Sequence, residues 1–151
     1  MELLQGIETR RSMRGFKDTP VTEDTIRRIL QAAGRSPSYT NTQPWEVVVV
    51  MGKKRDALSK ILYDLAASGN PGGSDMPRQD TWPAELDRRS KEHGARRFSA
   101  LNVGRDDAAL RKELRLTNFK FFDAPCALFL FMDSTLGAWS TFDMGLFAQT
   151  L

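Results

Sequence analysis

The 151-residue sequence contains one cysteine, Cys126, and one histidine, His93. A single cysteine excludes an intrachain disulfide and is compatible with a reducing compartment. His93 has no second histidine and no carboxylate cluster at metal-ligand spacing. This pattern favours a solvated surface histidine over a catalytic one, so the sequence predicts no metal site.

Long apolar runs are also missing. No run is long enough to span a bilayer, and Glu2, Gln5 and Glu8 interrupt the segment where a signal peptide would be apolar. We therefore expect a cytoplasmic protein with no membrane partner. The P-loop, the Rossmann glycine fingerprint, internal repeats and low-complexity segments are absent as well.

A large excess of either charge is also absent. The formal net charge of +3 suits an anionic ligand, but the sequence has no recognised nucleic-acid-binding module. A small basic nucleic-acid binder therefore stays a minor alternative, and we expect no nucleic-acid partner. The length and the hydrophobic share of 40% are those of one soluble globular domain, which we assign to residues 1–151.

A basic cluster, Arg10-Arg11-Ser12-Met13-Arg14, follows a short amphipathic segment. It places three guanidinium groups and a hydroxyl within five residues. Guanidinium groups are planar, permanently charged and able to bind two oxygens at once, which suits a phosphate. By itself the cluster also fits a solvated basic turn.

A polar loop runs from Ser36 to Trp45, contains two prolines, and leads into the apolar run Trp45–Met51, which we interpret as a buried strand. A stiff polar loop before a core strand can present amide and hydroxyl groups to a heterocycle. An ordinary helix-to-strand connection remains the alternative. Together, the cluster and the loop suggest a phosphorylated ring cofactor.

Other elements follow from capping and periodicity. Thr22 caps a predicted helix over residues 23–33, and Ser140 is expected to cap a last helix. Residues 84–100 are predicted to be a charged helix, and Cys126–Met132 a second buried strand. Between the helices, Ser68–Pro83 is rich in glycine and proline and is predicted to be a mobile loop or lid.

From Arg10 to Val50, the order of basic cluster, capped helix, polar loop, Pro-Trp and valine strand resembles the N-terminal signature of the nitroreductase family of flavin enzymes. The resemblance continues more loosely through Asn118, Phe121–Pro125, Asp143–Gly145 and Gln149. It implies an α+β fold, with a mixed β-sheet flanked by helices, and an intimate homodimer with two FMN molecules at the subunit interface.

The resemblance also assigns residue roles. The phosphate and the pyrimidine edge of the flavin would be held by Arg10, Arg11, Ser12 and Arg14. The loop that reaches the flavin from the partner subunit would comprise Pro37, Ser38, Tyr39, Asn41 and Gln43. Asn118 would contact the flavin ring, and Lys120 is a further candidate contact. No side chain is assigned as catalytic, because the cofactor carries the chemistry.

The implied function is transfer of hydride from NAD(P)H through FMN to nitroaromatics, quinones or similar small flat electrophiles. A noncatalytic or degenerate flavin-binding dimer module and a reductive dehalogenase of the same superfamily are the alternatives. Family members run considerably further than residue 151. We therefore expect this chain to hold the N-terminal and central part of such a domain, with its sheet incomplete.

Overall fold

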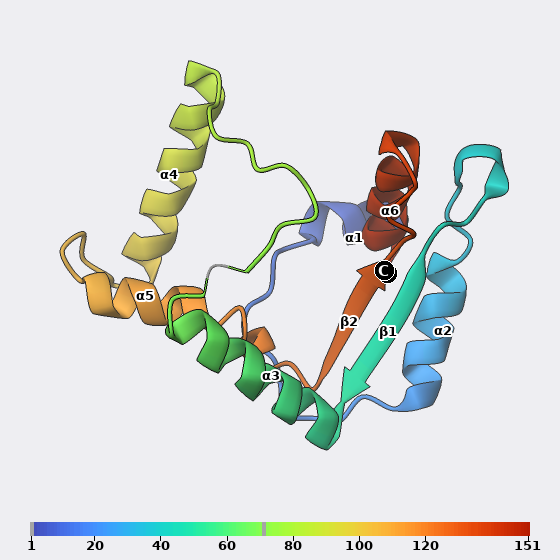
Figure 1. The fold of residues 1–151 in the computed structure, drawn as a ribbon, viewed down its shortest axis with the longest axis horizontal. Coiled ribbons are helices and arrows are strands. Elements are labelled where there is room, and N and C mark those ends of the chain that lie inside the picture. The colour runs from blue at the N-terminus through green and yellow to red at the C-terminus, as the bar shows by residue number, and fades with distance from the viewer. Residues whose placement is uncertain (1, 71) are drawn as a thin grey trace. The chain divides into compact units, whose positions relative to one another are not determined.

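A computed structural model describes residues 2–70 and 72–151 of the chain (Figure 1). Its elements, in chain order, are α1 (Leu3–Thr9), α2 (Glu23–Ala33), η1 (Tyr39–Asn41), β1 (Glu46–Met51), α3 (Gly52–Ala67), α4 (Ala84–Ala100), α5 (Ala108–Leu116), η2 (Phe121–Asp123), β2 (Cys126–Phe131) and α6 (Ala138–Thr150). Helix α2 begins where the sequence predicts, because the Thr22 hydroxyl accepts a hydrogen bond from the Thr25 amide at 3.2 Å.

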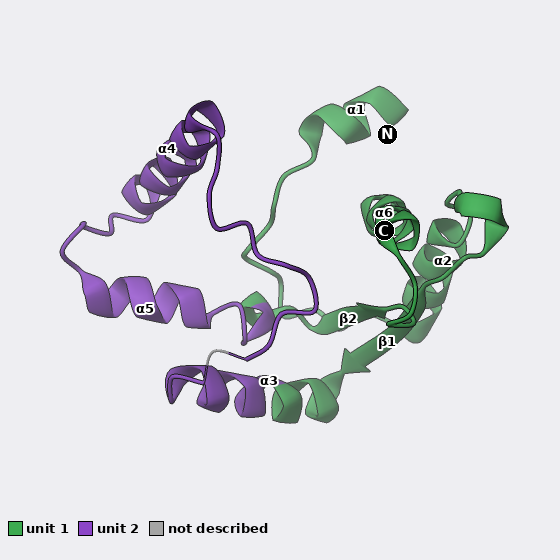
Figure 2. Ribbon diagram, turned by 45° about the horizontal axis from the view of Figure 1, so that its top comes forward, with its two compact units in different colours: residues 1–58, 122–151 green, residues 59–121 purple. Residues whose placement is uncertain are grey.

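The chain divides into two compact units (Figure 2). Unit 1 contains the residues up to Leu58 together with Phe122–Leu151, and unit 2 is Ser59–Phe121. The boundary therefore falls inside α3. Unit 1 holds both strands, the basic cluster and the polar loop, so most of the predicted site residues lie in it.

The sheet of unit 1 is an antiparallel pair of strands, β1 and β2. Their register places Glu46 opposite Phe131 and Met51 opposite Cys126. Both strands lie where the apolar runs predict them, and helices with an antiparallel sheet confirm the α+β class. In the described residues this pair is the whole sheet, so the parallel pairing of a mixed sheet is not seen.

The core of unit 1 forms where α6 packs against α2 and η1 (Figure 1). Ala33 of α2 and Phe147 of α6 are the most deeply buried apolar residues, at 0% and 1% exposure. Trp45, at the start of β1, stacks on Phe147. Helix α6 thus packs against the start of the strand pair and against the polar loop in one core.

Several strand side chains remain in solvent. Val48 is 49% exposed and Phe131 is 50% exposed, although both come from apolar runs that predict burial on both faces. Because the valines of β1 differ in exposure along the strand, only one part of its surface is covered within the described residues. The strands therefore leave apolar surface uncovered within the described residues, where the apolar runs predicted burial.

Unit 2 contains the charged helix α4 and the shorter helix α5. Ion pairs within α4 join Glu85 to Arg88 and to Arg89, and these side chains are exposed, as predicted. Asp107 caps the start of helix α5, because its carboxylate accepts from the Leu110 amide at 3.0 Å. The stretch predicted as a loop, Ser68–Pro83, lacks helices and strands over its described part, and its residue 71 lies outside the described residues.

The predicted start of the last helix was wrong. Helix α6 begins at Ala138 with Gly137 before it, so Ser140 lies in the first turn, where its amide donates to the Gly137 carbonyl at 3.1 Å. Upstream of the helix, the Asp133 carboxylate accepts hydrogen bonds from the amide and hydroxyl of Thr135, which closes a separate turn. The earlier helix start places Trp139 inside the helix.

Among residues 2–70 and 72–151, no helix is long and apolar enough to cross a membrane, and no group of three or more His, Cys, Asp or Glu side chains could hold a metal ion.

Candidate functional site

The basic cluster follows α1 in an extended, exposed segment. Helix α1 ends at Thr9, and the chain from Arg10 to Arg14 has no regular structure. All five side chains of residues 10–14 are exposed. The segment therefore presents its guanidinium groups to solvent, as a phosphate-binding segment requires.

The arginines of this cluster are not equivalent. Arg11 folds back on its own chain, where Nη1 donates to the carbonyls of Glu8 at 3.1 Å and Arg10 at 3.0 Å. The Arg14 guanidinium lies over the Phe122 ring, 5.8 Å from its centroid. Within the described residues, neither Arg10 nor Arg14 forms an ion pair, so these two keep their charge free for an anion.

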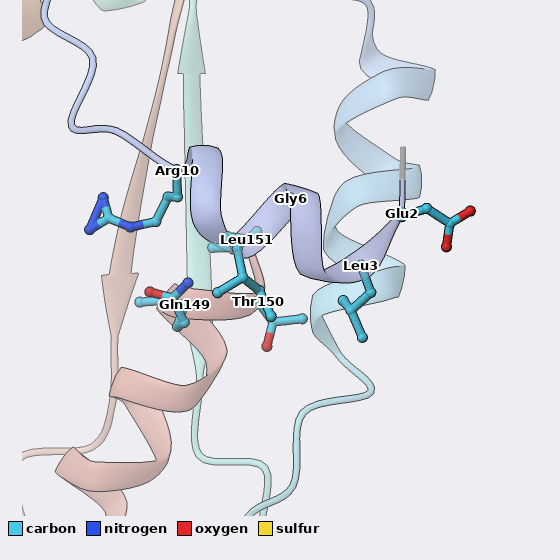
Figure 3. Close-up of a pocket in the computed structure, with 9 residues that line it drawn as sticks. Glu2, Leu3, Gly6, Arg10, Gln149, Thr150 and Leu151 are labelled. Carbon is cyan, nitrogen blue, oxygen red and sulfur yellow. The ribbon is translucent and has the colours of Figure 1, made fainter.

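Arg10 also reaches an open groove of about 910 Å³ between α1 and the end of α6 (Figure 3). Figure 3 places the side chains of Arg10 and Gln149 on the same side of this groove. Its lining residues are Glu2, Leu3, Gly6, Ile7, Arg10, Ala148, Gln149, Thr150 and Leu151. The groove contains no residue of the polar loop, so it does not bring the two predicted halves of the site together.

The polar loop is held by hydrogen bonds among its own residues. Ser38 Oγ accepts from the Gln43 amide, and Asn41 Oδ1 accepts from Gln43 Nε2, each at 2.9 Å. Thr40, Asn41 and Gln43 have positive φ angles of 50°, 58° and 48°. Left-handed φ is unfavourable for residues other than glycine, most of all for a β-branched one such as Thr40. The loop therefore has one defined conformation, which its hydrogen bonds maintain despite the unfavourable φ angles.

Helix α6 fastens this loop at two points. The Tyr39 amide donates to Asp143 Oδ2 at 3.1 Å, and Ser36 Oγ donates to Thr150 Oγ1 at 2.8 Å. Asp143 is only 3% exposed. No role was predicted for Asp143 from the sequence, although one signal was present: it is the only charged residue of α6.

Tyr39 also belongs to an exposed aromatic cluster that the sequence did not predict. Its ring stacks on Trp139, with centroids 5.8 Å apart and planes 17° apart, and Trp139 meets Phe142 edge-on. Tyr39, Trp139 and Phe142 are 62%, 67% and 60% exposed. Pro37 lies exposed beside them in the loop. These rings form an apolar patch that is open to solvent in this chain.

Asn118 lies in unit 2, apart from the other predicted site residues in the chain's division. Its Nδ2 donates to the Arg115 carbonyl at 2.7 Å, which fixes the amide at the end of α5. Lys120 Nζ lies 2.9 Å from Glu113 Oε1 and 4.3 Å from the centroid of the Tyr63 ring.

The same carboxylate accepts from the Tyr63 hydroxyl at 3.0 Å. The hydrogen bonds from Lys120 and Tyr63 hold the pKa of Glu113 below its usual value, and the bond to Glu113 raises the pKa of Tyr63. In unit 2, therefore, Lys120 is oriented by a defined acidic partner.

Comparison with known proteins identifies the chain. The sequence model of the Nitroreductase family matches residues 7–151. The chain belongs to the nitroreductase family. Its family assignment thus covers both the basic cluster and the polar loop.

Two curated nitroreductases illustrate the similarity in sequence. The chain is 34% identical to nitroreductase NfnB of Mycolicibacterium smegmatis over 145 residues, which cover 96% of this chain and 62% of that protein. It is also 34% identical to a 4-nitrobenzoate reductase of Pseudomonas putida, covering 96% of this chain and 63% of the relative. The chain therefore spans somewhat less than two thirds of these nitroreductases.

Solved nitroreductases share the fold. The structure of FMN-dependent nitroreductase NfnB from Mycobacterium smegmatis, in complex with NADPH, matches with a TM-score of 0.90 at 34% identity. That match covers 99% of this chain and 69% of the other. The FMN and NADPH-dependent nitroreductase NfnB from sphigopyxis sp. strain HMH matches with a TM-score of 0.93 at 30% identity, covering 99% and 68%. The nitroreductase fold predicted from the sequence is therefore confirmed.

Proposed function

We propose that this chain binds FMN and serves an oxidoreductase that passes hydride from NAD(P)H through FMN to nitroaromatics, quinones or similar flat acceptors. The observation that carries the proposal is the match, over 99% of the chain at a TM-score of 0.90, to an FMN-dependent nitroreductase in complex with NADPH. FMN supplies the hydride-accepting ring, so the chain needs side chains that bind and orient it and no catalytic side chain.

The basic cluster fits the phosphate of FMN. Arg10 and Arg14 have no ion-pair partner in the part of the chain that the structure describes, and both are exposed. Such groups favour a phosphate strongly, because each charge-assisted hydrogen bond contributes roughly 1.5–3 kcal/mol. Arg11 is held on its own backbone, so its contribution would require release from the Glu8 carbonyl. Ser12 adds an exposed hydroxyl beside them.

The loop fits the polar edge of a flavin ring. Ser38 accepts one hydrogen bond through Oγ and still has its hydroxyl proton to donate. The bond between Asn41 Oδ1 and Gln43 Nε2 leaves the Asn41 amide nitrogen and the Gln43 carbonyl for another partner. Pro37 and Tyr39 complete the loop. In unit 2, the Asn118 carbonyl and the Lys120 amine are the proposed ring contacts.

We infer a homodimer in which the loop reaches the flavin of the partner subunit. The exposed cluster of Tyr39, Trp139 and Phe142 supports this inference, because a second copy would remove these rings from water. We also infer that the protein works in the cytoplasm, where reducing conditions suit the free Cys126.

We further propose that residues 1–151 act as the N-terminal and central part of a longer nitroreductase-like domain. The exposed faces of Val48 and Phe131 support this proposal, since apolar strands are normally covered on both sides. An isolated pair of strands is also marginal, and three or more are normally needed for independent stability.

The test is to purify the 151-residue chain, identify any released flavin by chromatography, and follow NADPH and NADH oxidation with 4-nitrobenzoate or benzoquinone. Because the chain is proposed to be part of a longer domain, we expect it to retain FMN poorly through purification and to show acceptor-dependent oxidation when FMN is supplied in excess. FMN binding without oxidation would favour the noncatalytic module, and halide release from a halogenated aromatic would favour the dehalogenase. A folded chain that binds no FMN even at millimolar concentrations contradicts the proposal.

A further inference from the structure

Asp143 is a buried carboxylate in an otherwise uncharged helix. It is 3% exposed, and α6 contains no other charged residue. Burying such a group is unfavourable unless hydrogen bonds compensate it. The Tyr39 amide donates to its Oδ2 at 3.1 Å, which links residues 104 positions apart in the sequence. The hydrogen bond therefore does more than satisfy a buried group of α6, because it also holds a distant loop.

The acceptor end of this link lies on a rigid element. Asp143 lies in the middle of α6. One turn later in the same helix, Phe147 is fully buried and stacks on Trp45. One turn before Asp143, Trp139 stacks on the Tyr39 ring. Residues four apart share a helix face, so Trp139 and Asp143 hold the ring and the amide of Tyr39 from the same side.

The donor end lies in a strained segment. Tyr39 precedes Thr40 and Asn41, which have φ angles of 50° and 58°. A non-glycine residue in this region is strained and keeps this conformation only when its surroundings enforce it. The bonds from Gln43 to Ser38 and Asn41 are local, so they move with the loop. The Asp143 bond attaches the loop tip to the core.

We propose that Asp143 is a positioning residue, which sets the conformation of the loop from Pro37 to Gln43 through its bond to the Tyr39 amide. The inference rests on the proposed function, in which this loop contacts the flavin of the partner subunit. Because Asp143 is buried and bonded to the Tyr39 amide, it would act through Tyr39. Its loss therefore weakens cofactor binding while the fold survives, since α6 keeps its buried contacts through Phe147.

The test compares Asp143→Ala with Asp143→Asn in the full 151-residue chain. Fluorescence titration gives the FMN dissociation constant, and near-ultraviolet circular dichroism reports the stacked Tyr39 and Trp139 rings. We expect Asp143→Ala to raise the dissociation constant roughly tenfold, as loss of one buried hydrogen bond predicts, and to weaken the aromatic signal. Asp143→Asn keeps a carbonyl acceptor and should restore both readouts to within about threefold of the wild type.

Ser59→Ala is the matched control. Ser59 is also buried, at 8% exposure, and donates one hydrogen bond, to the Phe119 carbonyl, but it lies in unit 2. The Ser59→Ala variant should have a lower melting temperature and an unchanged aromatic signal from the loop. If Asp143→Ala fails to fold, Tyr39→Pro removes the donor instead, and Tyr39→Ala is the partner that keeps the amide. Ser38 has a ψ of 154°, which accepts a following proline.

Two results would overturn the inference. One is an Asp143→Ala variant with wild-type FMN affinity and an unchanged aromatic signal. The other is an Asp143→Asn variant as impaired as the alanine variant, because the acceptor geometry would then not be the property that matters. A wild-type chain that binds no FMN sinks the proposed function instead. In that case the aromatic signal alone decides whether Asp143 positions the loop.

Discussion

Trp45 lies almost parallel to Phe147, with ring centroids 4.8 Å apart and planes 19° apart. Trp45 closes the polar loop and Phe147 is the most deeply buried large side chain of α6. The pair therefore joins the start of the strand to the helix that also holds the loop through Asp143 and Thr150. The loop owes its position to this part of the core.

Replacing Phe147 with alanine should destabilise unit 1 by about 3–5 kcal/mol, because it removes a buried ring and leaves a cavity beneath Trp45. Chemical unfolding followed by tryptophan fluorescence measures the change. Phe142→Ala on the same helix is the control, since Phe142 is 60% exposed and its loss should cost far less. Equal losses for the two variants would show that the stacked pair does not carry the core.

Replacing both Arg10 and Arg14 with alanine should weaken FMN binding by several kcal/mol, at roughly 1.5–3 kcal/mol for each charge-assisted contact. The flavin content of the purified variant and its titration with FMN provide the measurement. The control is the double variant Arg27→Ala with Arg28→Ala, which removes the same charge from the exposed side chains of α2. Unchanged flavin occupancy in the Arg10 and Arg14 variant contradicts the assignment.

The active species should be a dimer with an interface larger than the roughly 1,600 Å² of a standard protein contact. The reason is that the cluster of Tyr39, Trp139 and Phe142 exposes three aromatic rings on one surface. Light scattering gives the oligomeric state, and Trp139→Ala should shift it towards monomer. Trp82→Ala is the control, because Trp82 is similarly exposed, at 52%, but lies in unit 2. A flavin-loaded, active monomer excludes this prediction.

The contacts of Glu113 predict how stability depends on pH. Lys120 and Tyr63 lower its pKa below the ordinary value of 4.5, so the carboxylate form is favoured in the folded state. The resulting stabilisation is complete above pH 4.5 and is lost as the pH falls through the lower pKa of the folded protein. Melting temperatures measured from pH 7 downwards should show a smaller acid-induced decrease for Glu113→Gln than for the wild type.

Tyr63 acts at the opposite end of the pH scale. Its bond to Glu113 raises its pKa above 10.0, so its contribution is complete below pH 10.0 and is lost as the pH rises through the folded-state value. Tyr63→Phe should remove this loss of stability at alkaline pH. The ultraviolet absorbance of tyrosinate follows the ionisation of Tyr63 directly in the wild type. If the acid and alkaline profiles of both variants match the wild type, the contacts of Glu113 do not contribute to stability.

Local patterns predicted the helices and strands well. Thr22 and the acidic residues after it determine the start of α2, because a capping hydroxyl and the helix dipole act within one turn. The two apolar runs became β1 and β2, because the strand preference of a short apolar run also depends only on neighbouring residues. The start of α6 was missed, because the helix follows Gly137, which has no capping side chain for the sequence to signal.

The candidate site was predictable only in its composition. The residue types at positions 10–14 and 36–45 indicated a phosphate and a ring, and that interpretation stays a prediction. No local rule predicted that Arg11 would fold onto the Glu8 carbonyl while Arg10 and Arg14 form no ion pair with any described residue. Neither could local rules predict left-handed φ angles at Thr40 and Gln43, because both residues disfavour them.

By itself, the sequence determined the family, the class of fold and the kinds of side chain available for a ligand, since these depend on residue order and on short-range preferences. Only the tertiary structure decided how the loop is held. The bond between the Tyr39 amide and Asp143 joins residues 104 positions apart, so it forms only once α6 has packed on Trp45 and α2. Burial then makes that single hydrogen bond count, because the low-dielectric core offers the carboxylate few other partners.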